Sequence, residues 1–174
     1  MKIYTKTGDE GQTSLFTGER IAKGAPRVGT YGAIDEANSA LALSRAFSEI
    51  PEVRDRIFEL QKLLPKLMAD IASVNKPAMI KSADIERLEK EIDFMSENLP
   101  PIKSFVIPGD TKAGAFLDLA RTITRRAERS FCKLSEIETV HEDDRLFLNR
   151  LSDYLFMLMR IEDYMAAKKS ASEV

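Results

Sequence analysis

The N-terminal segment concentrates residues of the kind that bind phosphate. The run 5–14 reads TKTGDEGQTS and holds three threonines, one serine and one lysine, and Gly18 follows it. Hydroxyl and ammonium groups donate hydrogen bonds to phosphate oxygens, and glycines permit positive φ and a close approach of the backbone to a ligand. The run lacks the GxxxxGK[ST] spacing of a Walker A loop. Its alternatives are therefore an anion-binding loop and a solvated terminus.

A second set of candidate residues lies on one side of a helix predicted from about Thr111 to Leu134. Four arginines share the run 120–129 with one glutamate. At about 100° per residue, Arg121, Arg125 and Glu128 fall within about 60°, and Arg129 lies about 40° further on. Guanidinium groups bind phosphate or carboxylate through two parallel hydrogen bonds, which favours a polyanion site. The alternative is a solvated face with salt bridges one turn apart. The face expected in the core carries Phe116, Ala120, Ile123, Ala127, Phe131 and Leu134.

Two further polar groups are candidates for a ligand site. Asp35 and Asn38 share a face of the first predicted helix, where acidic residues also suit the solvated first turn. Asn149 follows three apolar residues, so it is expected to be partly buried and to need hydrogen-bond partners.

Several catalytic chemistries are excluded by residue type. His141 is the only histidine and Cys132 the only cysteine. A di-iron bundle with paired Glu-x-x-His motifs, a cysteine zinc site and a serine or cysteine nucleophile with its histidine base all need more of these residues. We expect His141 in an exposed loop and Cys132 to be a bystander. Mg²⁺ held mainly by nucleotide phosphates remains open.

The composition predicts a soluble protein with one domain, residues 1–174. The formal net charge is −2, so no global basic field attracts nucleic acid or a membrane surface. The longest apolar run, 154–159, is six residues, and the N-terminus lacks the apolar region of a secretory signal. The lone cysteine and the missing signal predict a reducing, cytoplasmic location.

Apolar residues recur every three to four positions, which predicts an all-α fold. We expect a five-helix antiparallel bundle of the ferritin-like, four-helix-bundle type with a short extended N-terminal segment. Pro65 predicts a kink or break in the second helix, and Asp110 the N-cap of the fourth. The expected helices run from 27–29 to 48, from 51 to 74, from a Ser82 cap to 99, from 111 to 134 and from 143 to 170, with a short extended piece at 104–108.

In combination, these motifs resemble the PduO-type ATP:cob(I)alamin adenosyltransferases. Four blocks carry the resemblance, in order along nearly the whole chain: 3–20 with Lys23, 29–36, 105–109, and 120–129 followed by 148–155. Two residues depart from the family pattern. Asp110 stands where the family commonly has a second glycine, and Asp118 where it commonly has histidine.

The resemblance implies a homotrimer with active sites between adjacent subunits, in which residues 1–25 form an ATP-binding segment. Asp35 and Arg121 match an ion pair beside the corrinoid, Phe105 matches an aromatic residue under the corrin ring, and Arg125 belongs to the catalytic set. The positions that match the ATP site are Thr5, Lys6, Thr7, Gly8, Thr13, Ser14, Lys23, Arg125, Arg126, Glu128, Arg129 and Asn149.

The implied reaction transfers the 5′-deoxyadenosyl group of ATP to Co(I) of cobalamin or cobinamide and releases triphosphate. It needs no general base, in keeping with the single histidine. Mg²⁺ would accompany the ATP phosphates, a reductase would supply the electron for Co(I), and a cobalamin-dependent enzyme would use the product. The alternatives are a non-catalytic ATP- and corrinoid-binding chaperone and a purely structural trimeric bundle.

Overall fold

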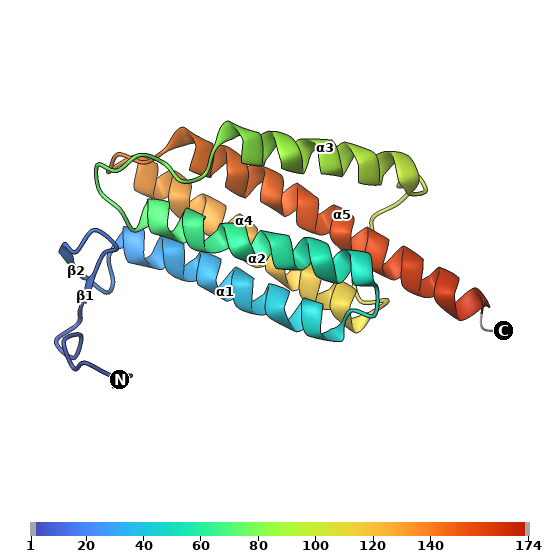
Figure 1. Cartoon of the computed structure of the whole chain (residues 1–174), viewed down its shortest axis with the longest axis horizontal. Helices are drawn as coiled ribbons and strands as arrows, with labels where there is room; N and C mark the ends of the chain where they lie inside the picture. Colours follow the sequence, from blue (N-terminus) through green and yellow to red (C-terminus); the bar gives the residue numbers. More distant parts are fainter. Residues whose placement is uncertain (1–2, 173–174) are drawn as a thin grey trace.

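The computed structural model describes residues 3–172, in which helices of alternating direction lie along a common axis (Figure 1). This architecture confirms the predicted antiparallel helical bundle. The helices are α1 (Pro26–Phe47), α2 (Pro51–Ile71), α3 (Ser82–Asn98), α4 (Lys112–Ser135) and α5 (Glu142–Ser172).

Helix α5 is the centre of the packing. It contacts α2, α3 and α4, while α1 contacts α2 and α4. Because α5 is covered on several sides, buried side chains occur around most of its circumference, including Phe147, Leu151 and Leu158. Phe131 of α4 and Leu41 of α1 are also fully buried in this core.

Two predicted helix caps were wrong, and α2 is not broken at Pro65. Helix α2 continues through Pro65, which lies on its exposed side, where water can satisfy the carbonyl that the proline leaves unpaired. Thr111, not Asp110, caps α4, and Lys81, not Ser82, occupies the N-cap position of α3. Residues 104–108, predicted to be extended, lie in the loop before α4 and form neither a helix nor a paired strand.

The buried face of α4 is rotated slightly from the predicted one. Leu117 and Thr124 are buried, while Phe116 is only partly buried and stacks on Phe47 of α1 with ring centroids 5.6 Å apart. The Thr124 hydroxyl is satisfied by the Ala120 carbonyl, 2.8 Å away. A threonine whose hydroxyl bonds within its own helix can therefore lie in the core.

The N-terminal segment forms a small hairpin at the end of the bundle where α1 begins (Figure 1). Strands β1 (Gln12–Ser14) and β2 (Arg20–Ala22) pair antiparallel. Leu15 is buried beneath the turn, and the Phe16 N–H donates to the Ala72 carbonyl at 2.8 Å. The hairpin is thus docked on the loop between α2 and α3.

Two buried carboxyl groups meet at the same end of the bundle. Asp70 of α2 accepts hydrogen bonds from the N–H groups of Met79, at 2.7 and 2.8 Å, and Ile80, at 2.8 Å. Asp144 of α5 is 1% exposed, and one of its oxygens has no partner in the described structure. Burial and the neighbouring Asp70 carboxylate raise the pKa of Asp144 to about 8. The Asp144 carboxyl therefore holds its proton to a higher pH than an exposed aspartate, beside the Asp70 side chain.

Replacing the N-cap of α4 tests how firmly this helix begins at Thr111. The Thr111 hydroxyl accepts from the Gly114 N–H and donates to Asp163, both at 2.8 Å. Thr111→Val should lower the free energy of unfolding by about 1–2 kcal/mol in urea titrations. Thr122→Val is the matched control, because the exposed Thr122 hydroxyl bonds only to the Leu119 carbonyl. Equal losses in the two variants would contradict the capping role.

The Asp144 pKa predicts how stability depends on pH. The folded chain retains this proton up to about pH 8, whereas the unfolded chain releases it near its ordinary value of 3.8. The free energy of unfolding should therefore decline between about pH 4 and pH 8 through this group. Asn at position 144 can still donate a hydrogen bond to Asp70 but does not titrate. The free energy of unfolding of Asp144→Asn, compared with that of wild type at the same pH, should therefore be more favourable at pH 8 than at pH 5. Urea titrations at both values measure this, with exposed Asp153→Asn as control. Parallel pH curves for wild type and Asp144→Asn would contradict the raised pKa of Asp144.

Candidate active site

The arginine-rich side of α4 lies next to the polar sides of α1 and α5. Arg126 of α4 forms an ion pair with Glu36 of α1. On the other flank, the Asn149 amide of α5 donates to Glu128 at 2.8 Å. The structure therefore brings two predicted site residues, Glu128 of α4 and Asn149 of α5, into direct contact.

Asn149 is held from both ends of its amide. Its oxygen accepts from Arg150 at 2.9 Å, while Arg150 also pairs with Glu89 of α3 at 2.7 Å. Asn149 is partly buried, as predicted. Because both ends of the amide are engaged, its orientation beside Glu128 is fixed without a ligand.

Two arginines of the strip remain available to an anion. Arg125 and Arg129 are exposed, and neither forms a hydrogen bond or an ion pair with the residues described here. Each brings a planar group of hydrogen-bond donors that can bind an oxyanion through two contacts. With Arg126 already paired to Glu36, the strip retains an uncompensated positive charge.

The expected ion pair between Asp35 and Arg121 is not formed in this structure. The Arg121 Nε donates instead to Asp118 at 2.8 Å, one turn earlier on α4. Asp35 is exposed, and within residues 3–172 it forms no ion pair. Asp118 thus takes the guanidinium, because residues three positions apart on one helix lie side by side on its surface.

The phosphate-binding candidates of the N-terminal segment are organised by glycine geometry. A Cβ atom on Gly8 would lie 3.1 Å from the Lys23 Nζ, so glycine allows the lysine to cross this loop. Gly11 has φ of 79°, a conformation that other residues adopt with strain. The Gly11 carbonyl accepts from the Lys23 N–H at 2.8 Å. These contacts bring Lys23 beside the loop although it is distant in sequence.

Most hydroxyl groups of this segment are accessible. Thr5 and Thr7 are exposed and share a hydrogen bond of 2.8 Å, and Lys6 between them has a positive φ of 62°. On β1, Ser14 is exposed and Thr13 is partly buried. Arg20, which the candidate residues did not include, donates to the Thr7 carbonyl at 2.6 Å and to Ser14 at 3.2 Å. Its place on the opposite strand is visible only once the hairpin is known.

The two halves of the predicted ATP site are separate in the single chain. Across residues 3–172, no hydrogen bond or ion pair joins the N-terminal segment to the arginine strip of α4.

Phe105 lies in the loop between α3 and α4 and is 90% exposed. Its neighbour Val106 packs against the core, so the loop is anchored while Phe105 points away from the protein.

The single histidine and the single cysteine lie outside the strip and the N-terminal segment. Within residues 3–172, no three histidine, cysteine, aspartate or glutamate side chains form a metal-binding group. Cys132 is exposed. His141 is partly buried rather than exposed, and it lines a cavity with Asp70 and Asp144 because its loop folds over the end of α2.

Every helix in the described range is too short or too polar to span a bilayer.

Comparisons with known proteins agree with this geometry. The family model described as cobalamin adenosyltransferase matches residues 3–162. The chain is 42% identical over 169 residues to the corrinoid adenosyltransferase PduO of Citrobacter freundii, covering 94% of this chain and 50% of that protein. A second corrinoid adenosyltransferase of the same organism is 42% identical over 167 residues, covering 93% of this chain and 95% of that protein. The chain thus spans half the length of the first relative and nearly all of the second.

A solved structure extends the match to three dimensions. It is a variant of the PduO-type ATP:corrinoid adenosyltransferase from Lactobacillus reuteri complexed with cobalamin and ATP, with 35% identity and a TM-score of 0.89. The match covers 95% of this chain and 96% of that one. The family model, the relatives and the solved structure all match this chain over most of its length. The chain therefore belongs to the cobalamin adenosyltransferase family.

Proposed function

We propose that this chain is an ATP:corrinoid adenosyltransferase. Co(I) of the corrinoid attacks the 5′-carbon of ATP with its electron pair, and a cobalt–carbon bond forms. The bond between the 5′-carbon and its oxygen breaks, and the electron pair leaves with triphosphate. The cobalt is formally oxidised to Co(III), and no proton is transferred.

The observation that carries this proposal is the pair of unpartnered arginines on α4. Arg125 and Arg129 lie beside the Asn149–Glu128 hydrogen bond, on a strip whose charge is not neutralised. The leaving triphosphate is the part of the reaction that gains negative charge. Fixed guanidinium donors aimed at developing charge are an effective form of transition-state stabilisation.

The nucleotide site would combine this strip with the N-terminal segment. Lys23 would contact phosphate beside Gly8, where the absent Cβ leaves room for the amine. Exposed hydroxyls at Thr5, Thr7 and Ser14 would accept or donate further hydrogen bonds. The full proposed ATP set is Thr5, Lys6, Thr7, Gly8, Thr13, Ser14, Lys23, Arg125, Arg126, Glu128, Arg129 and Asn149.

Mg²⁺ fits this arrangement as a companion of the nucleotide. Because the described residues contain no preformed metal cluster, triphosphate oxygens would supply most of its ligands, as is usual for Mg²⁺. When bound, it neutralises part of the triphosphate charge. Glu128, which accepts from Asn149 at 2.8 Å, is the one acidic residue of the proposed set.

The corrinoid side of the site would be built from Phe105 and the polar groups of α1 and α4. An exposed aromatic ring can cover one face of the corrin and exclude water as an axial ligand, which makes Co(II) easier to reduce. Arg121 of α4, which pairs with Asp118, would belong to the corrinoid side of the site. Asp35 would become its partner only if a bound corrinoid or a neighbouring subunit displaces Asp118.

The separation of the two halves of the site supports assembly. In a homotrimer with sites between subunits, the hairpin of one chain would reach the arginine strip of the next. We place residues 1–174 in one domain, with residues 1–25 as the nucleotide-binding segment. A reductase for Co(II), a cobalamin-dependent enzyme that uses the product, and a reducing cytoplasmic location complete the proposal.

A non-catalytic carrier of ATP and corrinoid is the competing function, and turnover separates the two. The test is an anaerobic assay with chemically reduced cob(I)alamin and Mg-ATP. Adenosylcobalamin should appear at a rate that saturates with ATP. Binding of ATP without product would instead establish the carrier.

Arg125→Lys tests the contribution of the arginine strip. Lysine keeps the charge but loses the two-pronged hydrogen bonding, so kcat/KM should fall by about 10²-fold. Steady-state kinetics with cob(I)alamin measure the loss. Arg54→Lys, at an exposed arginine of α2 outside the proposed site, is the matched control. Equal kinetics for Arg125→Lys and wild type would remove Arg125 from the site.

Phe105→Ala tests the role of the exposed ring. Loss of the apolar wall should reduce turnover from Co(II) with a reducing system far more than turnover from prereduced Co(I). Both assays are run on the same preparation. Phe94→Ala serves as control, since Phe94 is 54% exposed on α3. Equal losses in the two assays would contradict a role in axial-ligand exclusion.

A further inference from the structure

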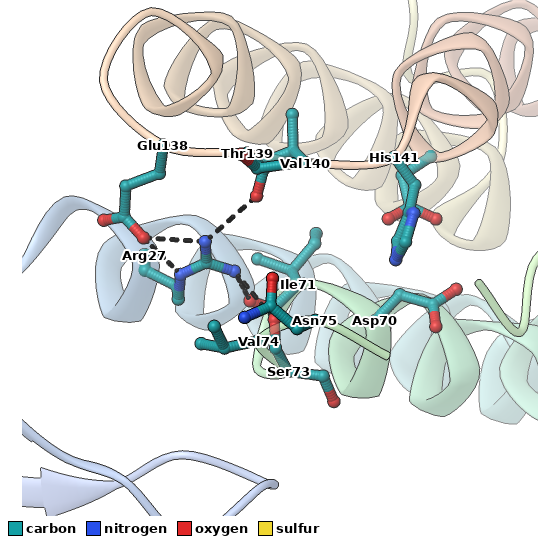
Figure 2. A pocket seen from close by; sticks show the side chains of 11 residues that line it. Arg27, Asp70, Ile71, Ser73, Val74, Asn75, Glu138, Thr139, Val140 and His141 are labelled. Carbon is teal, nitrogen blue, oxygen red and sulfur yellow. Dashed lines mark hydrogen bonds and ion pairs between the residues drawn. The ribbon is translucent and has the colours of Figure 1, made fainter. Parts of the chain in front are cut away.

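Arg27 is a buried guanidinium at the first turn of α1, and it lies outside every group assigned above. Only 3% of the residue is exposed. Figure 2 shows its side chain reaching across the end of the bundle between two loops. A charged group this deeply buried is tolerated only when its donors are satisfied.

The partners of Arg27 come from two loops distant in sequence. From the loop after α4, Glu138 accepts from the Nε at 2.8 Å, and the Thr139 carbonyl accepts from the Nη2 at 3.3 Å. From the end of α2, the carbonyls of Ile71 and Ser73 accept from the Nη1 at 2.6 and 3.1 Å. Arg27 therefore fixes the position of the loop between α2 and α3 relative to α1.

The same loop supports the N-terminal hairpin. The Phe16 N–H donates to the Ala72 carbonyl at 2.8 Å, and the Val74 N–H donates to the Thr17 hydroxyl at 3.3 Å. The two loop residues that hold the hairpin thus lie on either side of Ser73, which Arg27 binds. A shift of Ser73 would move both attachment points of the hairpin turn.

The far side of this loop is held by a separate group. The Asp70 carboxylate binds the N–H groups of Met79 and Ile80, so the loop is anchored at its beginning and its end. Among residues 3–172, the hydrogen bonds from this loop to the hairpin come from Ala72 and Val74, which flank the Ser73 that Arg27 binds. Loss of Arg27 should therefore free the part of the loop that matters to the hairpin while leaving the rest attached.

We propose that Arg27 is a positioning residue for the nucleotide-binding segment, acting through the loop between α2 and α3 and the hairpin docked on it. This inference rests on the proposed ATP site. Arg27 touches neither nucleotide nor corrinoid; it sets where Thr5, Thr7 and Lys23 meet the phosphates. Lysine cannot replace it, since one ammonium group cannot reach acceptors spread over both loops.

The test measures ATP and corrinoid separately in the full chain. Arg27→Lys should raise the ATP KM and the calorimetric ATP Kd by about tenfold, with kcat at saturating ATP and the cob(I)alamin KM within about threefold of wild type. Arg56→Lys is the matched control: Arg56 pairs with Glu52 on its own helix α2 and with Glu91 of α3, and neither partner belongs to the hairpin. It should lower the melting temperature without changing the ATP Kd.

Thr17→Val supplies a second test that leaves the bundle intact. It removes the acceptor of the Val74 N–H, so it should weaken ATP binding about threefold. The loss should be smaller in the Arg27→Lys background, because the two residues act through one loop. An unchanged ATP Kd in Arg27→Lys, strictly additive losses, or equal increases in both KM values would overturn the proposal. If wild-type protein binds ATP but forms no product, the proposed reaction fails while the ATP Kd still tests Arg27.

Discussion

The packing of α4 between α1 and α5 is the constraint on which the candidate site depends. Burying Ala120, Ala127 and Phe131 forces the opposite side of the helix, with its arginines, to face outward. Neighbouring helices then supply Glu36 and Asn149 at the edges of that strip. Because these partners engage Arg126 and Glu128, Arg125 and Arg129 keep their donors for a ligand. The core thus determines which charges are left unpaired.

The N-terminal hairpin meets a different physical demand. Three-residue strands are too short to be stable alone, so the hairpin takes its position from the loop beneath it. Leu15 supplies the apolar contact, and Ala72 and Val74 supply hydrogen bonds. A segment tied down at its turn, with its hydroxyls exposed, can move locally around a nucleotide while it remains attached to the bundle.

The sequence predicted the helices because their apolar residues recur with helical spacing, and Pro51 marks the start of α2. It predicted the arginine strip and a partly buried Asn149 for the same reason. It could not predict the short hairpin, whose strands are too brief to show a pattern, nor the choice of Asp118 over Asp35 by Arg121. Arg27 with Glu138, and Asp70 with Asp144, escaped notice because each pair joins residues far apart in the chain. Such contacts follow from the fold and leave no local signal.

The most direct test of this account is the stoichiometry of the products in one anaerobic reaction of wild-type protein with cob(I)alamin and Mg-ATP. Phosphorus NMR would identify the phosphate product, and the visible spectrum would quantify adenosylcobalamin. We predict one intact triphosphate for each cobalt–carbon bond formed, because the arginine strip stabilises triphosphate as a single leaving group. Release of diphosphate or monophosphate in its place, or adenosylation that does not depend on ATP, would contradict it.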